Sequence, residues 1–222
     1  MRAPSKPPRI AVVGELNVDL VASGLERAPS FGREVLVDDF RVVLGSASAV
    51  FACGAAKLGH EVTFVGKVGA DDFGSFCLGE LRRQGVRTRH VARDARVATG
   101  VTISLSSVED RMLVTWPGAI ATLRYADIPL AALKRHAHLH TTSYFLQTAL
   151  KPAVARLHDE AHRLGLTTSF DPNTDPRDAW GDEIWQVIDR TDVLFVNDRE
   201  AMRLTRRRQL RGALAALARR CR

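Results

Sequence analysis

The chain has 222 residues, which is enough for one large domain with a substantial hydrophobic core. Apolar residues make up 45% of the sequence and charged residues 26%, a balance that excludes a mainly disordered or fibrous protein. The formal net charge is +7, but eight arginines and no acidic residue fall within residues 203–222, so the first 202 residues carry 24 basic and 25 acidic side chains.

The amino-terminal residues 1–8 are basic and proline-rich, and we expect them to be flexible. The apolar run that follows is too short for a signal peptide, and no apolar stretch approaches the roughly 20 residues of a membrane-spanning helix. The sequence has three cysteines, an odd number without C-x-x-C spacing, which predicts neither a disulfide framework nor a thiolate zinc site. We therefore expect a protein of a reducing compartment, the cytoplasm, with no membrane segment.

From residue 10 onward, short apolar runs alternate with helical patterns. Residues 10–14 form a β-branched apolar run that ends in glycine, which predicts a strand buried on both faces in a parallel sheet. Further strands are predicted over residues 62–66, 138–142, 166–170 and 193–196. Helices are predicted over residues 46–58, 72–84, 149–164, 180–188 and 199–204. This alternation is typical of an α/β fold around a mostly parallel sheet.

Two stretches, residues 34–44 and 99–116, break this rhythm. Each alternates polar and apolar residues over strand-like lengths, with no helix in between. Such a pattern is typical of an antiparallel sheet that exposes one face to water. We therefore expect a small antiparallel flap beside the main sheet.

Polar and small residues follow the first strands, where ligands bind in an open parallel sheet. Asn17 and Asp19 would share one face of an extended segment, and an amide beside a carboxylate suits the neighbouring hydroxyls of a sugar. An Asx turn is the alternative interpretation. Gly45 and Ser46 precede a predicted helix, so they either let backbone amides approach a ligand or serve as a cap and close packing.

Two later strands also end in polar residues. Asn197 and Glu200 have the spacing of a helix capping box, and their place beyond a strand end is also compatible with a metal or phosphate role. Residues 171–173 are interpreted as a proline turn. The sequence alone leaves the role of Asn197 and Glu200 open.

Two other features have simpler interpretations than a binding site. His136, His138 and His140 alternate as metal ligands on a strand would, but no carboxylate is adjacent and zinc is not favoured. The basic segment 203–222 could contact nucleic acid. Leucines recur in and before it at helical spacing, at Leu204, Leu210, Leu214 and Leu217. An amphipathic helix with a solvated basic face is therefore favoured, and nucleic-acid binding is not.

Several motifs, taken in chain order, resemble the PfkB family of carbohydrate and nucleoside kinases, which have a ribokinase-like fold. The motifs are Gly14-x-x-Asn17-x-Asp19, the Gly45-Ser46 turn with its helix ending at Leu58-Gly59, residues 65–74, and Asn197-x-x-Glu200-Ala201. The resemblance runs from Arg9 to about Thr205. It implies a three-layer α/β sandwich with a small β lid, and transfer of a phosphoryl group from ATP to a hydroxyl of a sugar or nucleoside-like molecule.

The resemblance also implies roles for the residues that bind the substrate. Asn17 and Asp19 would hold its hydroxyls, and the Gly45-Ser46 turn would lie behind the sugar. Gln147 would be a further substrate contact, because some ribokinase-like proteins have a substrate-binding acid there.

The remaining implied parts are the phosphate site and the lid. Asn197 and Glu200 would arrange Mg²⁺ and phosphate through water, with no residue bound directly to a metal. Residues 34–44 and 99–116 would form the lid. Lid strands often pair between subunits in this family, so the resemblance is compatible with a homodimer, and the sequence alone leaves the oligomeric state open.

The sequence departs from the family pattern in three places. Ser46 stands where the family usually has a second glycine, and Val50 stands where it has an asparagine. The family's Gly-Ala-Gly-Asp segment, which supplies the general base and the amides that cradle phosphate, does not occur. By the resemblance, this segment and most of the nucleotide pocket would lie beyond Arg222.

We therefore expect residues 9–222 to form an incomplete ribokinase-like domain that lacks the C-terminal part of the fold. No catalytic residue is expected in this chain. A non-catalytic protein that binds a polyol or nucleoside is the alternative, as a pseudokinase or a partner subunit.

Overall fold

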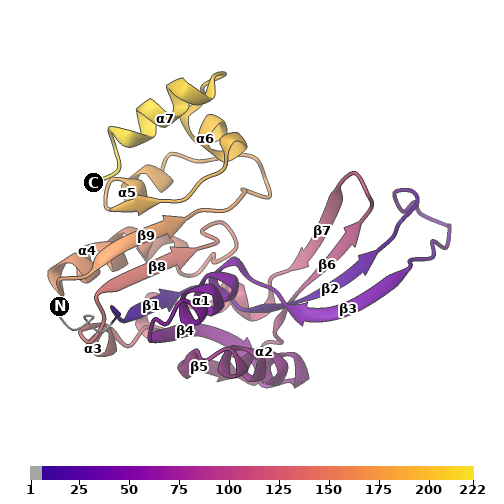
Figure 1. The fold of residues 1–222 in the computed structure, drawn as a ribbon, viewed down its shortest axis with the longest axis horizontal. Helices are drawn as coiled ribbons and strands as arrows, with labels where there is room; N and C mark the ends of the chain where they lie inside the picture. Colours follow the sequence, from indigo (N-terminus) through magenta and orange to yellow (C-terminus); the bar gives the residue numbers. More distant parts are fainter. Residues whose placement is uncertain (1–6) are drawn as a thin grey trace, which may run out of the picture.

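The computed structural model describes residues 7–222, so most of the segment expected to be flexible lies outside the described residues. Within them, a central sheet contains six strands, all parallel, in the order β10-β9-β8-β1-β4-β5 (Figure 1). The strands are β1 (Ile10–Val13), β4 (Val62–Gly69), β5 (Arg87–Asp94), β8 (His138–Thr142), β9 (Thr167–Asp171) and β10 (Val193–Leu194). The chain winds outward from β1 to β5 and then returns to the other side of β1. The winding therefore reverses between β1 and β8, where open α/β sheets bind ligands.

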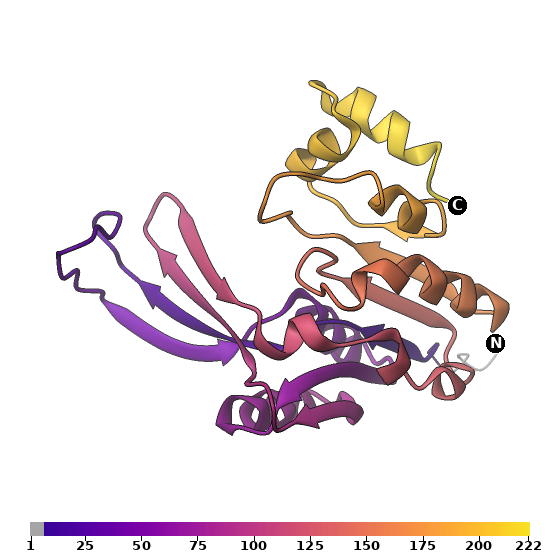
Figure 2. The same ribbon diagram turned by 180° about the vertical axis from the view of Figure 1, so that it is seen from behind.

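Helices cover both faces of this sheet (Figures 1 and 2). They are α1 (Ala47–Lys57), α2 (Asp72–Arg83), α3 (Leu130–Leu133), α4 (Val154–Arg163), α5 (Ile184–Ile188), α6 (Asp198–Thr205) and α7 (Leu210–Ala218). Ile10 and Val12 of β1 belong to the core beneath α1 and α2, whereas Ala11 and Val13 belong to the core on the α4 side. This alternation along β1 gives each face of the sheet its own core. The predicted α/β fold with three layers is confirmed.

A second sheet projects from the body as an arm (Figure 2). It contains four strands in the order β3-β2-β6-β7, namely β2 (Asn17–Ser23), β3 (Asp39–Leu44), β6 (Gly100–Ser106) and β7 (Arg111–Trp116). The expected small sheet is thus present, but it is mixed rather than antiparallel throughout. The outer pairs are antiparallel, while β2 and β6 at the centre run parallel. The difference arises from β2, which lies directly after β1 and outside the two predicted lid segments. It inserts between β3 and β6 and runs parallel to β6.

The two faces of this lid sheet differ in chemistry. Residues that are paired across strands share a face, so the register assigns every side chain to one side. One side, which we call the apolar lid face, is made of Phe40, Val42, Leu44, Val18, Leu20, Ala22, Val101, Ile103, Leu105, Met112, Val114 and Trp116. The other side, the polar lid face, carries Asn17, Asp19, Thr102 and Thr115, together with the apolar Val21, Val43 and Leu113. The polar and apolar residues alternate at most positions of these strands, and Val43 and Leu113 interrupt the alternation.

Two predicted helices are clearly shorter in the structure, and one strand is additional. The predicted helix 149–164 begins later, as α4, because Pro152 lacks a backbone N–H and lies in a short 3₁₀ turn, η3 (Lys151–Ala153). The predicted helix 180–188 is reduced to α5. Strand β5 was not predicted, since its charged side chains on the edge of the sheet hide its alternation.

The alternating histidines bind hydroxyl groups. The ring nitrogens of His138 lie 2.8 Å from Thr167 Oγ1 and 2.6 Å from Ser169 Oγ, and His140 Nδ1 lies 2.7 Å from Ser169 Oγ. In the part of the chain that the structure describes, no three His, Cys, Asp or Glu side chains are grouped to hold a metal ion. Over the same residues, no helix has the length and apolar character needed to cross a membrane.

The basic terminal segment packs against the body as a helix. Ala213 and Leu217 of α7 are buried, whereas Leu210 and Leu214 are exposed. Two bonds anchor the end of the chain: Arg220 Nη2 donates to Asp189 Oδ2 (2.6 Å), and Arg222 Nη1 lies 2.9 Å from His162 Nδ1. The predicted surface helix is therefore present, with only part of its apolar stripe buried.

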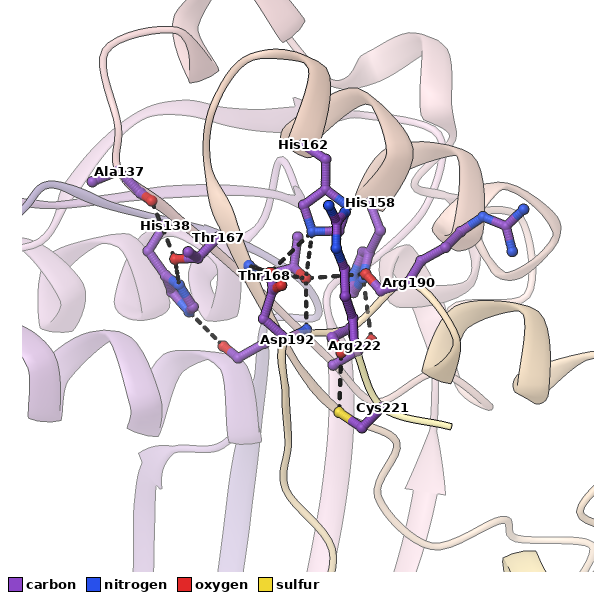
Figure 3. Close-up of polar contacts among 12 residues, drawn as sticks. Ala137, His138, His158, His162, Thr167, Thr168, Arg190, Asp192, Cys221 and Arg222 are labelled. Atoms are coloured by element: carbon purple, nitrogen blue, oxygen red, sulfur yellow. Dashed lines mark hydrogen bonds and ion pairs between the residues drawn. The ribbon is translucent and has the colours of Figure 1, made fainter. Parts of the chain in front are cut away.

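A network of buried polar groups lies where β9 and β10 begin (Figure 3). Asp192 Oδ2 accepts a hydrogen bond from Thr168 N (2.7 Å) and lies 2.9 Å from His162 Nε2. Next to it, His158 Nε2 lies 2.9 Å from Thr141 Oγ1 and His158 Nδ1 lies 3.2 Å from Arg190 O. Burial lowers the pKa of His158 to about 4, so this histidine is neutral in the folded protein near pH 7.

We predict that acid destabilises the fold through His158. Because its pKa is about 4 in the folded protein and roughly 6.5 in an unfolded chain, only the unfolded chain binds a proton between these values. Stability present above pH 6.5 is therefore lost as the pH falls toward 4, by on the order of 3 kcal/mol. Urea unfolding at pH 7 and pH 4.5 measures this loss, which His158→Gln should reduce. His60→Gln is the control, and an unchanged pH dependence in His158→Gln would contradict the prediction.

Candidate functional site

The loops after β1, β3 and β8 meet around one buried carboxylate, that of Glu15. Its Oε2 accepts hydrogen bonds from Thr142 Oγ1 (2.8 Å) and from Ser48 Oγ. Its Oε1 accepts hydrogen bonds from Ser48 N (3.1 Å) and Ser46 Oγ (3.1 Å). Only 3% of Glu15 is exposed. Glu15 therefore joins the end of β8 and the start of α1 to the end of β1, at the point where the winding of the sheet reverses.

Asn17, Asp19 and Gly45 come together at the base of the lid. Asn17 Nδ2 donates to Asp19 Oδ1 (2.8 Å) and to Thr102 Oγ1 (3.2 Å) on the neighbouring strand. Burial raises the pKa of Asp19, although the hydrogen bond from Asn17 acts in the opposite direction. A Cβ atom on Gly45 would lie 2.1 Å from Asp19 Oδ1 and 2.6 Å from Asn17 Nδ2. Only glycine therefore allows the chain to pass this close to the two side chains.

Ser46 has a backbone conformation that is unusual for its side chain. Its φ is +81°, in the region that favours glycine, and a non-glycine residue there is strained. Its hydroxyl donates to Glu15 O (2.7 Å) and accepts from Ala49 N (3.0 Å), so it also caps α1. These bonds offset the strain at a position where the resemblance leads one to expect glycine.

Asn197 and Glu200 form the capping box of α6. Asn197 Oδ1 accepts from Glu200 N (2.9 Å), and Glu200 Oε2 accepts from Asn197 N (3.0 Å). Thr174 Oγ1 donates to the other carboxylate oxygen of Glu200 (3.1 Å). Asn197 and Glu200 thus form the helix capping box that their spacing predicts. Glu200 is buried beside the loop that follows β9.

Asp171 is a carboxylate at the same edge of the sheet that the sequence indicates only as part of a turn. It ends β9 in register with Thr142, and its Oδ1 accepts from Asn173 N (3.0 Å). Burial raises the pKa of Asp171 to about 6, and the charges of Glu200 and Glu15 act in the same direction. Asp171 and Glu200 both bond to the loop that follows β9, through Asn173 and Thr174, at the carboxyl edge of the sheet. The signal in the sequence is an acidic residue directly after a buried strand.

Gln147 is buried beside the same edge and has one unpaired atom. Its Nε2 donates to Thr142 O (2.5 Å), but within residues 7–222 its Oε1 has no hydrogen-bond partner. A buried acceptor of this kind requires a donor from water or from a ligand. The arrangement as a whole offers carboxylate, amide and hydroxyl groups to a polar molecule under the lid, with two acidic side chains beyond it.

Comparison with known proteins gives a consistent assignment. The profile of the pfkB family carbohydrate kinases matches residues 7–220. The chain is 30% identical over 193 residues to 2-dehydro-3-deoxygluconokinase of Bacillus subtilis (strain 168), which covers 82% of this chain and 59% of that protein. It is 28% identical over 214 residues to probable fructokinase-5 of Arabidopsis thaliana, covering 90% of this chain and 63% of that protein. The chain thus spans about three fifths of the length of these relatives.

Solved structures share the fold. The crystal structure of a PfkB protein from Polaromonas sp. JS666 has a TM-score of 0.80 and 25% identity, over 96% of this chain and 74% of that one. The structure of Arabidopsis thaliana ribokinase complexed with ribose and ATP has a TM-score of 0.77 and 20% identity, over 96% of this chain and 69% of that one. The ribokinase-like fold is thus confirmed, and the chain belongs to the PfkB family of carbohydrate kinases.

Proposed function

We propose that the protein transfers a phosphoryl group from ATP to a hydroxyl of a small sugar, and that this chain supplies the part that binds the sugar. The observation that carries the proposal is the contact of Asn17, Asp19 and Gly45 beneath the lid. The relatives that support it are a 2-dehydro-3-deoxygluconokinase and fructokinases.

Phosphoryl transfer depends chiefly on positioning and on neutralising charge, and these side chains supply the positioning. The carboxylate of Asp19 would accept hydrogen bonds from two sugar hydroxyls, and the amide of Asn17 keeps that carboxylate in place. Gly45 leaves room for the sugar, and the unpaired Oε1 of Gln147 would accept a further hydroxyl. The lid sheet would exclude water, which competes with the sugar as acceptor.

The acidic residues beyond the sugar fit Mg²⁺ held largely through water. Magnesium ions keep several waters and are bound by one or two carboxylates together with substrate phosphates. Asp171 and Glu200 are two such carboxylates, close enough that the charge of Glu200 raises the pKa of Asp171. Asn197 would fix Glu200 through the capping box. When bound, Mg²⁺ would neutralise charge on the phosphates of ATP.

A general base is not assigned in this chain, because the sequence contains no Gly-Ala-Gly-Asp segment. A second candidate function is binding of a polyol or nucleoside without phosphorylation, which the contact of Asn17, Asp19 and Gly45 would serve equally well. The two functions share the same acceptor site and differ in whether ADP forms.

The three cysteines are free, which supports the proposed location in the reducing cytoplasm.

Acceptor binding can be measured by calorimetry with D-fructose, D-ribose and 2-dehydro-3-deoxy-D-gluconate. We predict that the chain binds at least one of them and that Gly45→Ala weakens binding by about tenfold or more, because the added methyl displaces Asp19. Gly54→Ala is the matched control, since a Cβ on Gly54 meets nothing within 4 Å. ADP release with Mg²⁺ and ATP, measured on the whole natural protein, then separates a kinase from a binding protein. Absence of binding to all three, or full binding by Gly45→Ala, would refute the proposed site.

We also propose that a second copy of the chain covers the apolar lid face. No charged residue lies on this face, and several of its side chains are exposed, namely Phe40, Val42, Ile103, Met112, Val114 and Trp116. Contiguous exposed apolar surface of this kind marks an interface. Two identical faces can pack on each other about a two-fold axis, which agrees with the homodimer that the family resemblance allows.

Sedimentation tests this dimer with two neighbouring residues of β7. Val114 lies on the apolar lid face and Leu113 on the polar lid face, and each is 52% exposed. We predict that Val114→Glu yields a monomer, because the interface would bury a carboxylate without a partner. Leu113→Glu should leave the dimer intact. A monomeric wild-type chain, or equal effects of the two substitutions, would contradict this interface.

A further inference from the structure

Asp71 connects the body of the protein to the root of the lid. Its Oδ1 accepts from Gly74 N (2.7 Å), which caps α2, and from Thr99 Oγ1 (2.6 Å). Its Oδ2 accepts from Thr99 N (2.8 Å), and Thr99 Oγ1 in turn accepts from Gly69 N (2.9 Å). Thr99 is buried and directly precedes the lid strand β6. One carboxylate therefore caps a helix and also holds the residue from which the lid begins.

Backbone segments pack closely around this contact. A Cβ on Gly69 would lie 2.6 Å from Thr99 N, and a Cβ on Gly74 would lie 2.3 Å from Gly69 O. Where the chain leaves the lid after β7, a Cβ on Gly118 would lie 2.5 Å from Ala98 O. Close packing of this kind leaves little freedom for the root of the lid to shift.

The root of the lid is connected to the acceptor site through β6. Gly100 follows Thr99 and pairs in register with Asn17, and Thr102 pairs with Asp19. Thr102 Oγ1 also accepts the hydrogen bond from Asn17 Nδ2 (3.2 Å). A shift of Thr99 would therefore move the strand that supports both Asn17 and Asp19.

We infer that Asp71 is a positioning residue for the acceptor, which holds the root of β6 so that Asn17 and Asp19 keep their spacing. This inference rests on the proposed function of the same site. Burial alone would raise the pKa of Asp71, but the hydrogen bonds from Thr99 and Gly74 lower it, so the carboxylate is charged near pH 7. The residues 65–74 that resemble a family motif thus gain a role without contact to the sugar.

The test is Asp71→Asn, with Asp72→Asn as the matched control. Asparagine caps helices as well as aspartate does, so its Oδ1 can still accept from Gly74 N. Its NH₂ group, however, would face Thr99 N, and two donors cannot bond to each other. Asp71→Asn therefore keeps the cap of α2 and the bond from Thr99 Oγ1, which both use Oδ1, and removes the bond from the backbone N–H of Thr99 at the root of the lid. Asp72 is the first residue of α2, and Asp72→Asn removes the same single negative charge as Asp71→Asn.

Two measurements are made on the full chain: calorimetric affinity for the sugar that the wild type binds, and amide hydrogen exchange. We expect Asp71→Asn to lower the affinity for the sugar by about tenfold or more. We also expect faster amide hydrogen exchange in β6 and β7, with the exchange of α2 unchanged. Asp72→Asn should match the wild type in both. If Asp71→Asn does not fold, Thr99→Val and Thr99→Ser replace it, because valine removes the hydroxyl and serine keeps it. Valine should then show both effects and serine neither.

Wild-type affinity in Asp71→Asn would overturn the inference, and so would faster exchange of α2 and the central strands to the same extent as β6. If the wild type binds no sugar, the proposed function fails. In that case hydrogen exchange still decides the anchoring, since acceleration confined to β6 and β7 supports it and unchanged or uniform exchange rejects it.

Discussion

The buried carboxylate of Glu15 is the interaction on which the candidate site depends. It accepts hydrogen bonds from Thr142 at the end of β8 and from Ser46 and Ser48 at the start of α1. A buried carboxylate without such donors would cost several kcal/mol. The three segments are therefore held together where the winding of the parallel sheet reverses. Gly14 allows this approach, because a Cβ there would overlap Ser48 Oγ.

Strand β2 connects the segments held by Glu15 to the lid sheet. It begins two residues after Glu15, and its alternation presents Asn17 and Asp19 to the polar lid face and Val18 and Leu20 to the apolar lid face. One strand would thus serve the proposed acceptor binding on one side and the proposed subunit contact on the other. Parallel pairing with β6 makes the geometry of Asn17 and Asp19 dependent on a segment far away in the sequence. We infer that the hydrogen bonds of Asp71 to Thr99 hold the site in place through this pairing.

Local patterns in the sequence predict much of the body of the fold. The apolar run of β1 and the glycines that end α1 and α2 are properties of a few neighbouring residues, so these elements are found correctly. The pairing of β2 with β6 joins Asn17 to Thr102, 85 positions apart, and no local pattern reveals it.

The candidate site is likewise predictable from the sequence only in part. The proximity of Asn17, Asp19 and Gly45 follows from their position after strands. Glu15 and Asp171 do not stand out, because their importance arises from burial and from hydroxyl donors on other segments. The substrate contact of Gln147 stays a prediction.

The proposed acceptor site can be tested by a crystal structure of the chain with the sugar that binds most tightly. We expect sugar hydroxyls within hydrogen-bond distance of the Asp19 carboxylate, beneath the polar lid face and against Gly45. A sugar bound elsewhere on the protein, with no contact to Asn17 or Asp19, would show that the site is wrongly assigned.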